Sequence, residues 1–122
     1  MAAKKILVIE DNALNMKLVV TLLRLSQFEI IEAKDAEDGL KLAHIHRPNL
    51  ILMDIQLPGM SGLQATQVIK KDAELKDVPV VALTSYVMEG DKDKIINAGC
   101  DGYIPKPIDT RHFLETISAY IN

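Results

Sequence analysis

The chain lacks several features that assign a protein to a class directly. Its single cysteine, Cys100, excludes an internal disulfide, fits a reducing compartment and is expected to be a small buried residue. The net charge is −3, so no basic excess favours nucleic acid or an anionic membrane. The apolar stretch at residues 6–9 is too short for a signal peptide, and no segment reaches the length of a membrane span. These absences predict a cytoplasmic protein.

The sequence also lacks internal repeats, low-complexity tracts and linker-like changes of composition. Hydrophobic residues make up 48% and charged residues 25% of the chain, which is typical of globular proteins. Its 122 residues are enough to close one ordinary core. We therefore expect a single domain over residues 1–122, with no additional output domain.

What the chain does contain is a regular alternation of short apolar segments and stretches with helical spacing. Near-continuous apolar strands are typical of a parallel sheet that helices cover on both faces. The pattern therefore predicts an α/β fold of five strand–helix units. The expected strands are residues 5–9, 28–33, 50–53, 78–83 and 102–105.

Periodicity and capping residues locate the helices. Asp35 and Asp109 are the expected N-caps of the second and fifth helices, and Gly99 is the expected end of the fourth. The third and fourth helices are expected at residues 62–71 and 88–98. The apolar positions at helical spacing are Leu14, Leu18, Leu22 and Leu25 in the first helix, Ala36, Leu40 and Ala43 in the second, Ile95, Ile96 and Ala98 in the fourth, and Phe113, Ile117 and Tyr120 in the fifth.

Polar residues follow four of the apolar strands at the point where each strand ends. Glu10 and Asp11 follow the first strand, and Asp54 follows the third. Thr84 ends the fourth, and Lys106 comes directly after the fifth. Because the carboxyl ends of parallel strands line the ligand crevice of an open α/β sheet, we expect these residues to converge there.

The residue types of this group point to phosphoryl chemistry. An isolated Asp54 would be a desolvated charge, and crowded carboxylates raise each other's pKa unless a cation joins them. Mg²⁺ prefers oxygen ligands and is the natural partner of Asp11 and Asp54. A carboxylate so placed acts as a nucleophile toward phosphorus. Mg²⁺, the Lys106 ammonium and the Thr84 hydroxyl would then each compensate one phosphoryl oxygen.

Each residue taken alone also has a simpler interpretation. Asp11 or Asn12 fits the N-cap of the first helix, Thr84 fits a turn, and Lys106 fits an ordinary surface lysine. Their joint occurrence at the strand ends favours the site over these readings. We expect no metal or phosphoryl role for the histidines, which have no carboxylate or cysteine partner at ligand spacing and are placed at the surface or its boundary: His44, His46 and His112.

Over essentially its whole length the chain resembles the receiver domains of two-component response regulators. The resemblance rests on VIEDN (8–12), LILMDIQLPGMSG (50–62), VALTS (81–85) and YIPKPI (103–108), spaced as in that family. It implies a doubly wound (βα)5 fold of the flavodoxin or CheY type, with a five-stranded parallel sheet of order 2-1-3-4-5. Within the family, the chain is most similar to stand-alone members that control cell division.

The resemblance also implies roles for the residues at the strand ends. Asp54 is the phosphoacceptor, and Mg²⁺ is the cofactor, with Mn²⁺ as a substitute. The metal ligands are Asp11, Asp54, the backbone carbonyl of Gln56 and, through a water, Glu10. Lys106 contacts the phosphate.

A switch and its partners follow from the same resemblance. Thr84 moves toward the phosphate and Tyr103 turns inward, which changes the face formed by the fourth helix, fifth strand and fifth helix. A histidine kinase or phosphotransfer protein is the expected donor, and a downstream protein is the expected target on that face. The chain is expected to be a monomer or weak dimer, and to catalyse only its own phosphorylation and dephosphorylation.

Two other classes fit less well. Mg²⁺-dependent phosphatases of the haloacid-dehalogenase type use Asp-x-Asp, but the second position here is Gln56, which cannot transfer a proton. The chain also has no room for a cap domain. A flavodoxin-like nucleotide or flavin binder would need a glycine-rich phosphate loop after the first strand, and none is present.

Three finer expectations concern the loops around the site. The family uses a cis peptide at the position of Lys106–Pro107, a geometry that X-Pro bonds adopt at modest cost. Ser85 replaces a common alanine and adds a hydroxyl beside the site. Gln56 and Tyr86 flank the approach of hydrolytic water; Tyr86 either shields the phosphoryl group and slows its loss, or packs against the fourth helix.

Overall fold

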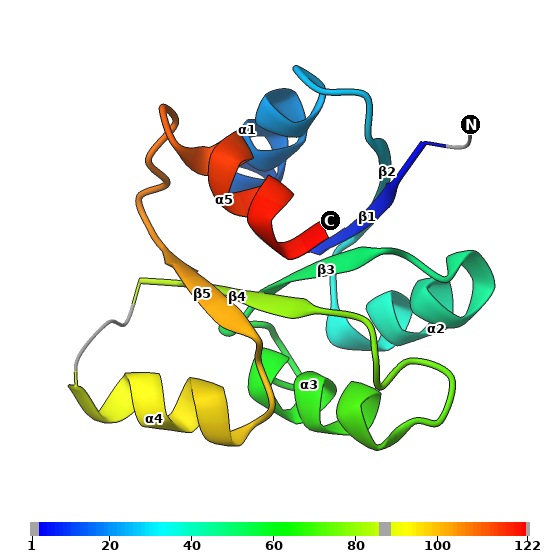
Figure 1. Cartoon of the computed structure of the whole chain (residues 1–122). Coiled ribbons are helices and arrows are strands. Elements are labelled where there is room, and N and C mark those ends of the chain that lie inside the picture. The colour runs from blue at the N-terminus through cyan, green and yellow to red at the C-terminus, as the bar shows by residue number, and fades with distance from the viewer. Residues whose placement is uncertain (1–2, 86–88, 122) are drawn as a thin grey trace.

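The computed structural model describes residues 3–85 and 89–121, and within them five parallel strands form one sheet of order β2-β1-β3-β4-β5. This order confirms the expected doubly wound α/β fold (Figure 1). The strands are β1 (Lys5–Ile9), β2 (Glu29–Ala33), β3 (Leu50–Asp54), β4 (Val80–Thr84) and β5 (Gly102–Pro105). The helices are α1 (Ala13–Leu23), α2 (Ala36–His46), α3 (Gly62–Lys71), α4 (Glu89–Asn97) and α5 (Phe113–Ile121).

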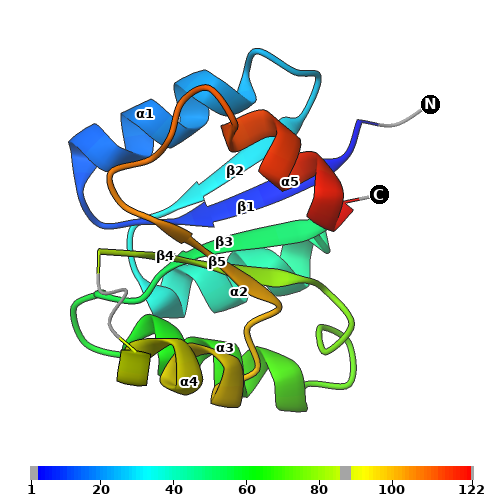
Figure 2. The ribbon, with the colours of Figure 1, turned by 60° about the vertical axis from the view of Figure 1, so that its left-hand side comes forward.

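The helices form a layer on each side of the sheet. Helices α1 and α5 cover one face, while α2, α3 and α4 cover the other (Figures 1 and 2). Successive strand residues point to opposite faces: Ile6 and Val8 belong to the core under α1 and α5, whereas Leu7 and Ile9 belong to the core on the other side. A central strand buried on both faces has no polar side, which explains its continuous apolar sequence.

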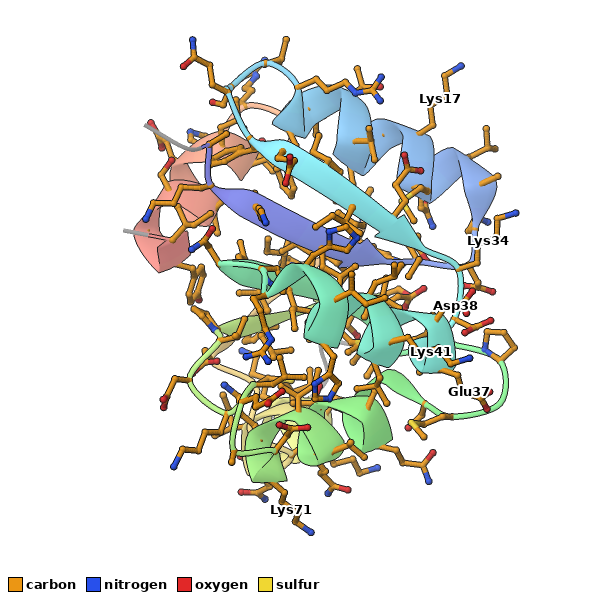
Figure 3. All side chains as sticks on the ribbon, turned by 90° about the vertical axis from the view of Figure 1, so that its right-hand side faces the viewer. Lys17, Lys34, Glu37, Asp38, Lys41 and Lys71 are labelled. Carbon is orange, nitrogen blue, oxygen red and sulfur yellow. The ribbon has the colours of Figure 1, made fainter. Side chains whose placement is uncertain are left out.

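Charged side chains mark the solvent side of these layers. On α2, the side chains of Glu37, Asp38 and Lys41 are exposed on the outer surface (Figure 3). Ala36 and Ala43 on the same helix are buried against the sheet, as the spacing predicted.

Capping residues of the expected types lie at the ends of three helices. Asp35 accepts a hydrogen bond from the backbone N–H of Asp38, which confirms it as the N-cap of α2. The N-cap of α1 is Asn12, whose Oδ1 accepts from two backbone N–H groups, so Asp11 is not used as a cap. Gly99, two residues after the end of α4, adopts a positive φ of 104°, a conformation that glycine allows at low cost.

Of the apolar stripe expected for α1, only Leu22 is buried. Leu14, Leu18 and Leu25 are exposed. The side chains that α1 buries are Met16, Val19, Val20, Leu22 and Leu23. Both sets have helical spacing, so the pattern alone did not identify the face that meets the sheet.

The start of α5 also differs from the expectation. Asp109 does not cap the helix, which begins at Phe113. Its side chain instead organises the preceding turn, by accepting from the backbone N–H of Arg111 and pairing with His112.

Among the described residues, no helix has the length and apolar character needed to cross a membrane.

Candidate functional site

The backbone of the sheet brings the predicted residues to one edge. Asp54 is the last residue of β3 and pairs in register with Leu83 of β4. The backbone N–H of Lys106 donates to the carbonyl of Thr84 at 2.8 Å, and that of Glu10 donates to the carbonyl of Ala33 at 3.0 Å. These bonds continue the strand ladders past their ends and hold the residues that follow.

Lys106 is at the centre of the charged group. Its Nζ donates a hydrogen bond to Oε1 of Glu10 at 2.7 Å and lies 3.3 Å from Oδ2 of Asp54. The peptide bond between Lys106 and Pro107 is cis, which confirms that expectation. The lysine predicted from strand ends therefore meets two of the three predicted carboxylates.

Asp54 is held from both sides. Its Oδ1 accepts a hydrogen bond of 2.9 Å from the backbone N–H of Gln56, while Oδ2 faces Lys106. Asp54 is only 4% exposed, and removing its carboxylate from water costs free energy. The two charge-assisted contacts offset part of that cost. These contacts explain how an aspartate can end an otherwise apolar strand.

Glu10 is the most perturbed acid of the site. Burial raises its pKa from 4.5 to about 7; Asp54 adds to the rise, and Lys106 opposes it. Its Oε1 is engaged by Lys106, while Oε2 is buried and has no hydrogen-bond partner among the described residues. Burial therefore favours the protonated form of Glu10 when no cation is present.

The three carboxylates fit a divalent cation. Glu10, Asp11 and Asp54 each offer an oxygen, and these oxygens lie within 4.8 Å of one another. The group contains three carboxyl groups and one ammonium, so acidic groups outnumber the basic one. An all-oxygen donor set suits Mg²⁺, and the exposed Asp11 leaves one side open to water ligands.

The remaining predicted residues lie around this group. Thr84 ends β4 and is only 1% exposed, whereas Ser85 and Gln56 are exposed. Tyr103 lies on β5, opposite Ala82 in register, and is half-buried. Tyr86, which was expected beside the site, lies outside the described residues.

The expectation that the histidines have no carboxylate partner at ligand spacing was wrong for His44 and His112. His44 places Nε2 at 2.9 Å from Asp72 and Nδ1 at 3.2 Å from Glu74. Arg47 also lies 2.7 Å from Glu74. His44 and Arg47 are on or next to α2, whereas the acids follow α3, so no local spacing in the sequence could reveal the pairing.

This second charge cluster is poorly suited to a metal. The two carboxylates already engage opposite nitrogens of one imidazole, and the side chains of His44 and Glu74 are exposed to water. Arg47 already neutralises Glu74. The cluster is an ion-pair network at the surface.

His112 pairs with Asp109 at 2.8 Å, again contrary to the expectation. The hydrogen bond between the two side chains raises the pKa of His112 and lowers that of Asp109. Both residues are exposed, as expected for surface histidines.

Cys100 is buried, as predicted. Burial raises the pKa of its thiol, which keeps it unreactive.

The fold and this site define a class. Residues 6–118 match the response regulator receiver domain family, and the chain belongs to that family. Receiver domains are phosphorylation-activated switches of two-component signalling, and their active site typically uses Mg²⁺. They interact with histidine kinases and downstream targets.

Among curated proteins, the chain is similar to "Polar-differentiation response regulator DivK" from two species. It is 48% identical to the Brucella anthropi protein over 118 residues, which are 97% of this chain and 96% of that protein. It is 47% identical to the Brucella ovis protein with the same coverage.

Solved structures show the same architecture. The receiver domain of sensor histidine kinase PA1611 from Pseudomonas aeruginosa has a TM-score of 0.90 and 29% identity, with 98% of each chain covered. That structure has a magnesium ion coordinated in its active-site cleft. The Vibrio cholerae chemotaxis protein CheY4 has a TM-score of 0.91 at 24% identity, with 98% of this chain and 99% of that chain covered, and supports the fold alone.

Proposed function

We propose that Asp54 is the phosphoacceptor of this receiver domain and that it takes its phosphoryl group from a phosphohistidine of a histidine kinase or phosphotransfer protein. The observation that supports this most is the arrangement of Asp54 at the end of β3, with Oδ1 held by the N–H of Gln56 and Oδ2 facing Lys106. The carboxylate is fixed in one orientation before any donor arrives. Such positioning lowers the entropic cost of an in-line transfer.

The transfer breaks the phosphorus–nitrogen bond of the donor and forms a phosphorus–oxygen bond to Asp54. The imidazole nitrogen keeps the electron pair and takes a proton. Lys106 moves its ammonium from the carboxylates to a phosphoryl oxygen, and the Thr84 hydroxyl meets another. Positioned charges of this kind account for most of the catalysis in phosphoryl transfer, because the protein has little covalent chemistry to perform.

Asp11, Asp54 and the backbone carbonyl of Gln56 would hold Mg²⁺, and Glu10 would reach it through a water; Mn²⁺ would substitute. When bound, the ion supplies charge neutralisation for the carboxylates and the phosphoryl oxygens. The close approach of the three carboxylates and the partnerless Oε2 of Glu10 support this set.

The proposed output is a change of shape read by other proteins. In the phosphorylated state Thr84 and Tyr103 move, and the face formed by α4, β5 and α5 offers a different surface to a downstream target or passes the phosphoryl group along a relay. The chain acts as a switch, not as an enzyme on other substrates, and as a monomer or weak dimer. The similar Brucella proteins are named for polar differentiation, which supports a role of this chain in cell-division control. We also propose that the chain acts in the cytoplasm.

A Mg²⁺-dependent phosphatase remains less well supported than the switch. Turnover would need a proton-transferring group two residues after the nucleophile, and Gln56 has an amide there. A phosphatase of this type also uses a cap domain to hold its substrate. Residues 3–85 and 89–121 form only the receiver fold and include no such domain.

Labelling with acetyl phosphate and Mg²⁺ tests the proposal. The wild type should acquire an acid-labile, hydroxylamine-sensitive phosphoryl group. Asp54→Asn should abolish it while the protein stays folded, and Asp77→Asn, an exposed loop control, should label as the wild type does. Labelling of Asp54→Asn at another residue would overturn the assignment, and steady release of phosphate from simple phosphate esters would revive the phosphatase.

A further inference from the structure

The ring of Tyr103 lies at the boundary between core and surface. It packs against the apolar core under α2, α3 and α4. It also lines a hollow of about 280 Å³ in the surface together with Pro105, Pro107 and Phe113. The ring is therefore held on one side by the core and is accessible from the other.

Lys92 of α4 lies over this ring. Its Nζ is 5.8 Å from the ring centroid, within the range of a cation–π contact. The lysine is exposed, so its ammonium keeps most of its water while it contacts the aromatic face. Among the described residues, no hydrogen bond or ion pair of Lys92 competes with this contact.

Helix α4 makes this contact more consequential, because the helix is anchored at one end. Ile95 is buried, and the N–H of Cys100 bonds to its carbonyl just beyond the helix. Lys70 and Asp101 form an ion pair of 2.9 Å next to that end. Residue Gly90 and the residues 92–94 are exposed, so Lys92 links the less anchored half of α4 to β5.

We propose that Lys92 is a positioning residue that holds Tyr103 at the surface and thereby favours the resting state of the switch. This inference rests on the proposed function, in which Tyr103 turns inward when Asp54 is phosphorylated. The inward side is the region of Thr84, which is 1% exposed. An ammonium could not follow the ring there without losing its water, so the contact exists only while the ring is at the surface.

A contact made in only one of two states shifts their equilibrium by its own free energy. Cation–π contacts at exposed sites contribute about 0.5–1 kcal/mol, which corresponds to a change of about two- to fivefold in the population ratio. Lys92 should therefore act as a modest brake on activation, and its loss should raise the inward population without phosphorylation.

The experiment uses the full chain labelled with 3-fluorotyrosine, with the Tyr103 signal assigned by Tyr103→Phe. Beryllofluoride with Mg²⁺ stands in for the phosphoryl group and defines the active limit of the fluorine shift. Lys92→Met removes the charge at similar length, and Lys92→Arg keeps a cation over the ring. Lys94→Met is the matched control, since it removes the same charge from an exposed position of the same helix.

The proposal predicts that the ligand-free Tyr103 signal of Lys92→Met moves toward the beryllofluoride limit. It also predicts that the beryllofluoride concentration at half-saturation falls about two- to fivefold, the change expected from one exposed cation–π contact. Lys92→Arg and Lys94→Met should match the wild type. An unmoved signal in Lys92→Met, or an equal shift in Lys94→Met, overturns the role of Lys92.

Failure of the proposed function is recognised separately. In that case beryllofluoride leaves the Tyr103 signal of the wild type unchanged, and there is no switch for Lys92 to bias. If beryllofluoride moves the wild-type signal but Lys92→Met resembles the wild type, only the inference about Lys92 fails.

Discussion

Two charge clusters in this chain contain similar groups in different surroundings. Glu10, Asp54 and Lys106 gather at the strand ends, with side chains that are 0%, 6% and 16% exposed. The surface cluster of His44, Asp72, Glu74 and Arg47 has side chains that are 43%, 24%, 54% and 54% exposed. Contact distances are short in both, so distance does not distinguish them.

Burial makes the difference. At the strand ends, charges are removed from water and held by the sheet backbone, so one proton or cation changes the energy of the whole group. At the surface, water and salt screen each pair, and the flexible side chains lose entropy when they pair. We therefore expect cation binding and phosphoryl chemistry at the strand ends. The surface cluster should contribute little to stability.

The largest effect should come from removing the buried cation. Lys106→Met should slow phosphorylation of Asp54 by acetyl phosphate about 100-fold, because removing a donor positioned at developing negative charge typically costs that much. Phosphorylation rates measured under saturating Mg²⁺ check this. Lys41→Met is the control, since Lys41 is exposed on the outer surface of α2 (Figure 3) and should change nothing. Equal rates in Lys106→Met and the wild type would contradict a phosphate-contacting role.

A medium effect should appear as a pH dependence of stability. The folded pKa of Glu10, about 7, is above its ordinary value of 4.5, so the folded state binds more protons between these values. The stabilisation of the folded state by the protonated Glu10 is fully present below pH 4.5 and is lost as pH rises through 7. The free energy of unfolding of the metal-free protein, measured with urea, should therefore fall relative to Glu10→Gln across this window.

The control for this prediction is Glu32→Gln, which changes an exposed acid on β2 and should keep the wild-type pH profile. If Glu10→Gln and the wild type give parallel pH profiles, the claim that folding raises the pKa of Glu10 is wrong. Saturating Mg²⁺ should reduce the loss of stability at pH 7, because the cation replaces the proton.

The smallest effect is expected at the surface cluster. Glu74→Gln removes the contacts to His44 and Arg47 and should lower the free energy of unfolding by no more than about 0.5 kcal/mol at physiological salt. The difference should shrink further as salt rises. Urea unfolding at low and high salt provides the measurement; a loss of several kcal/mol would show that this cluster is not a screened surface network.

The sequence predicted the buried cluster better than the surface one, for a physical reason. Asp54 and Lys106 follow apolar strands, and the rule that parallel strands end at one edge brings them together without further information. His44 meets Asp72 through the packing of α2 beside α3, which no sequence spacing encodes. The proton on Glu10 depends on how much water the folded chain excludes, which the sequence alone does not reveal.

The same reasoning explains the error on α1. Leu14 and Leu18 are as apolar as Val19 and Leu23, and both pairs have helical spacing. The residues that α1 buries are those that meet the sheet and α5 in the folded chain. Periodicity identified the helix, but only tertiary packing selected its face.

The most direct test of the contrast between the two clusters is a titration of ¹⁵N-labelled protein with Mg²⁺, followed residue by residue in amide NMR spectra. We expect saturable shifts at Glu10, Asp11, Asp54 and Gln56, and none at His44, Asp72 or Glu74. Asp11→Asn should weaken the first set of shifts. Shifts centred on the His44 cluster, or a strand-end site that stays silent at millimolar Mg²⁺, would contradict the claim that burial at the strand ends creates the cation and phosphoryl site.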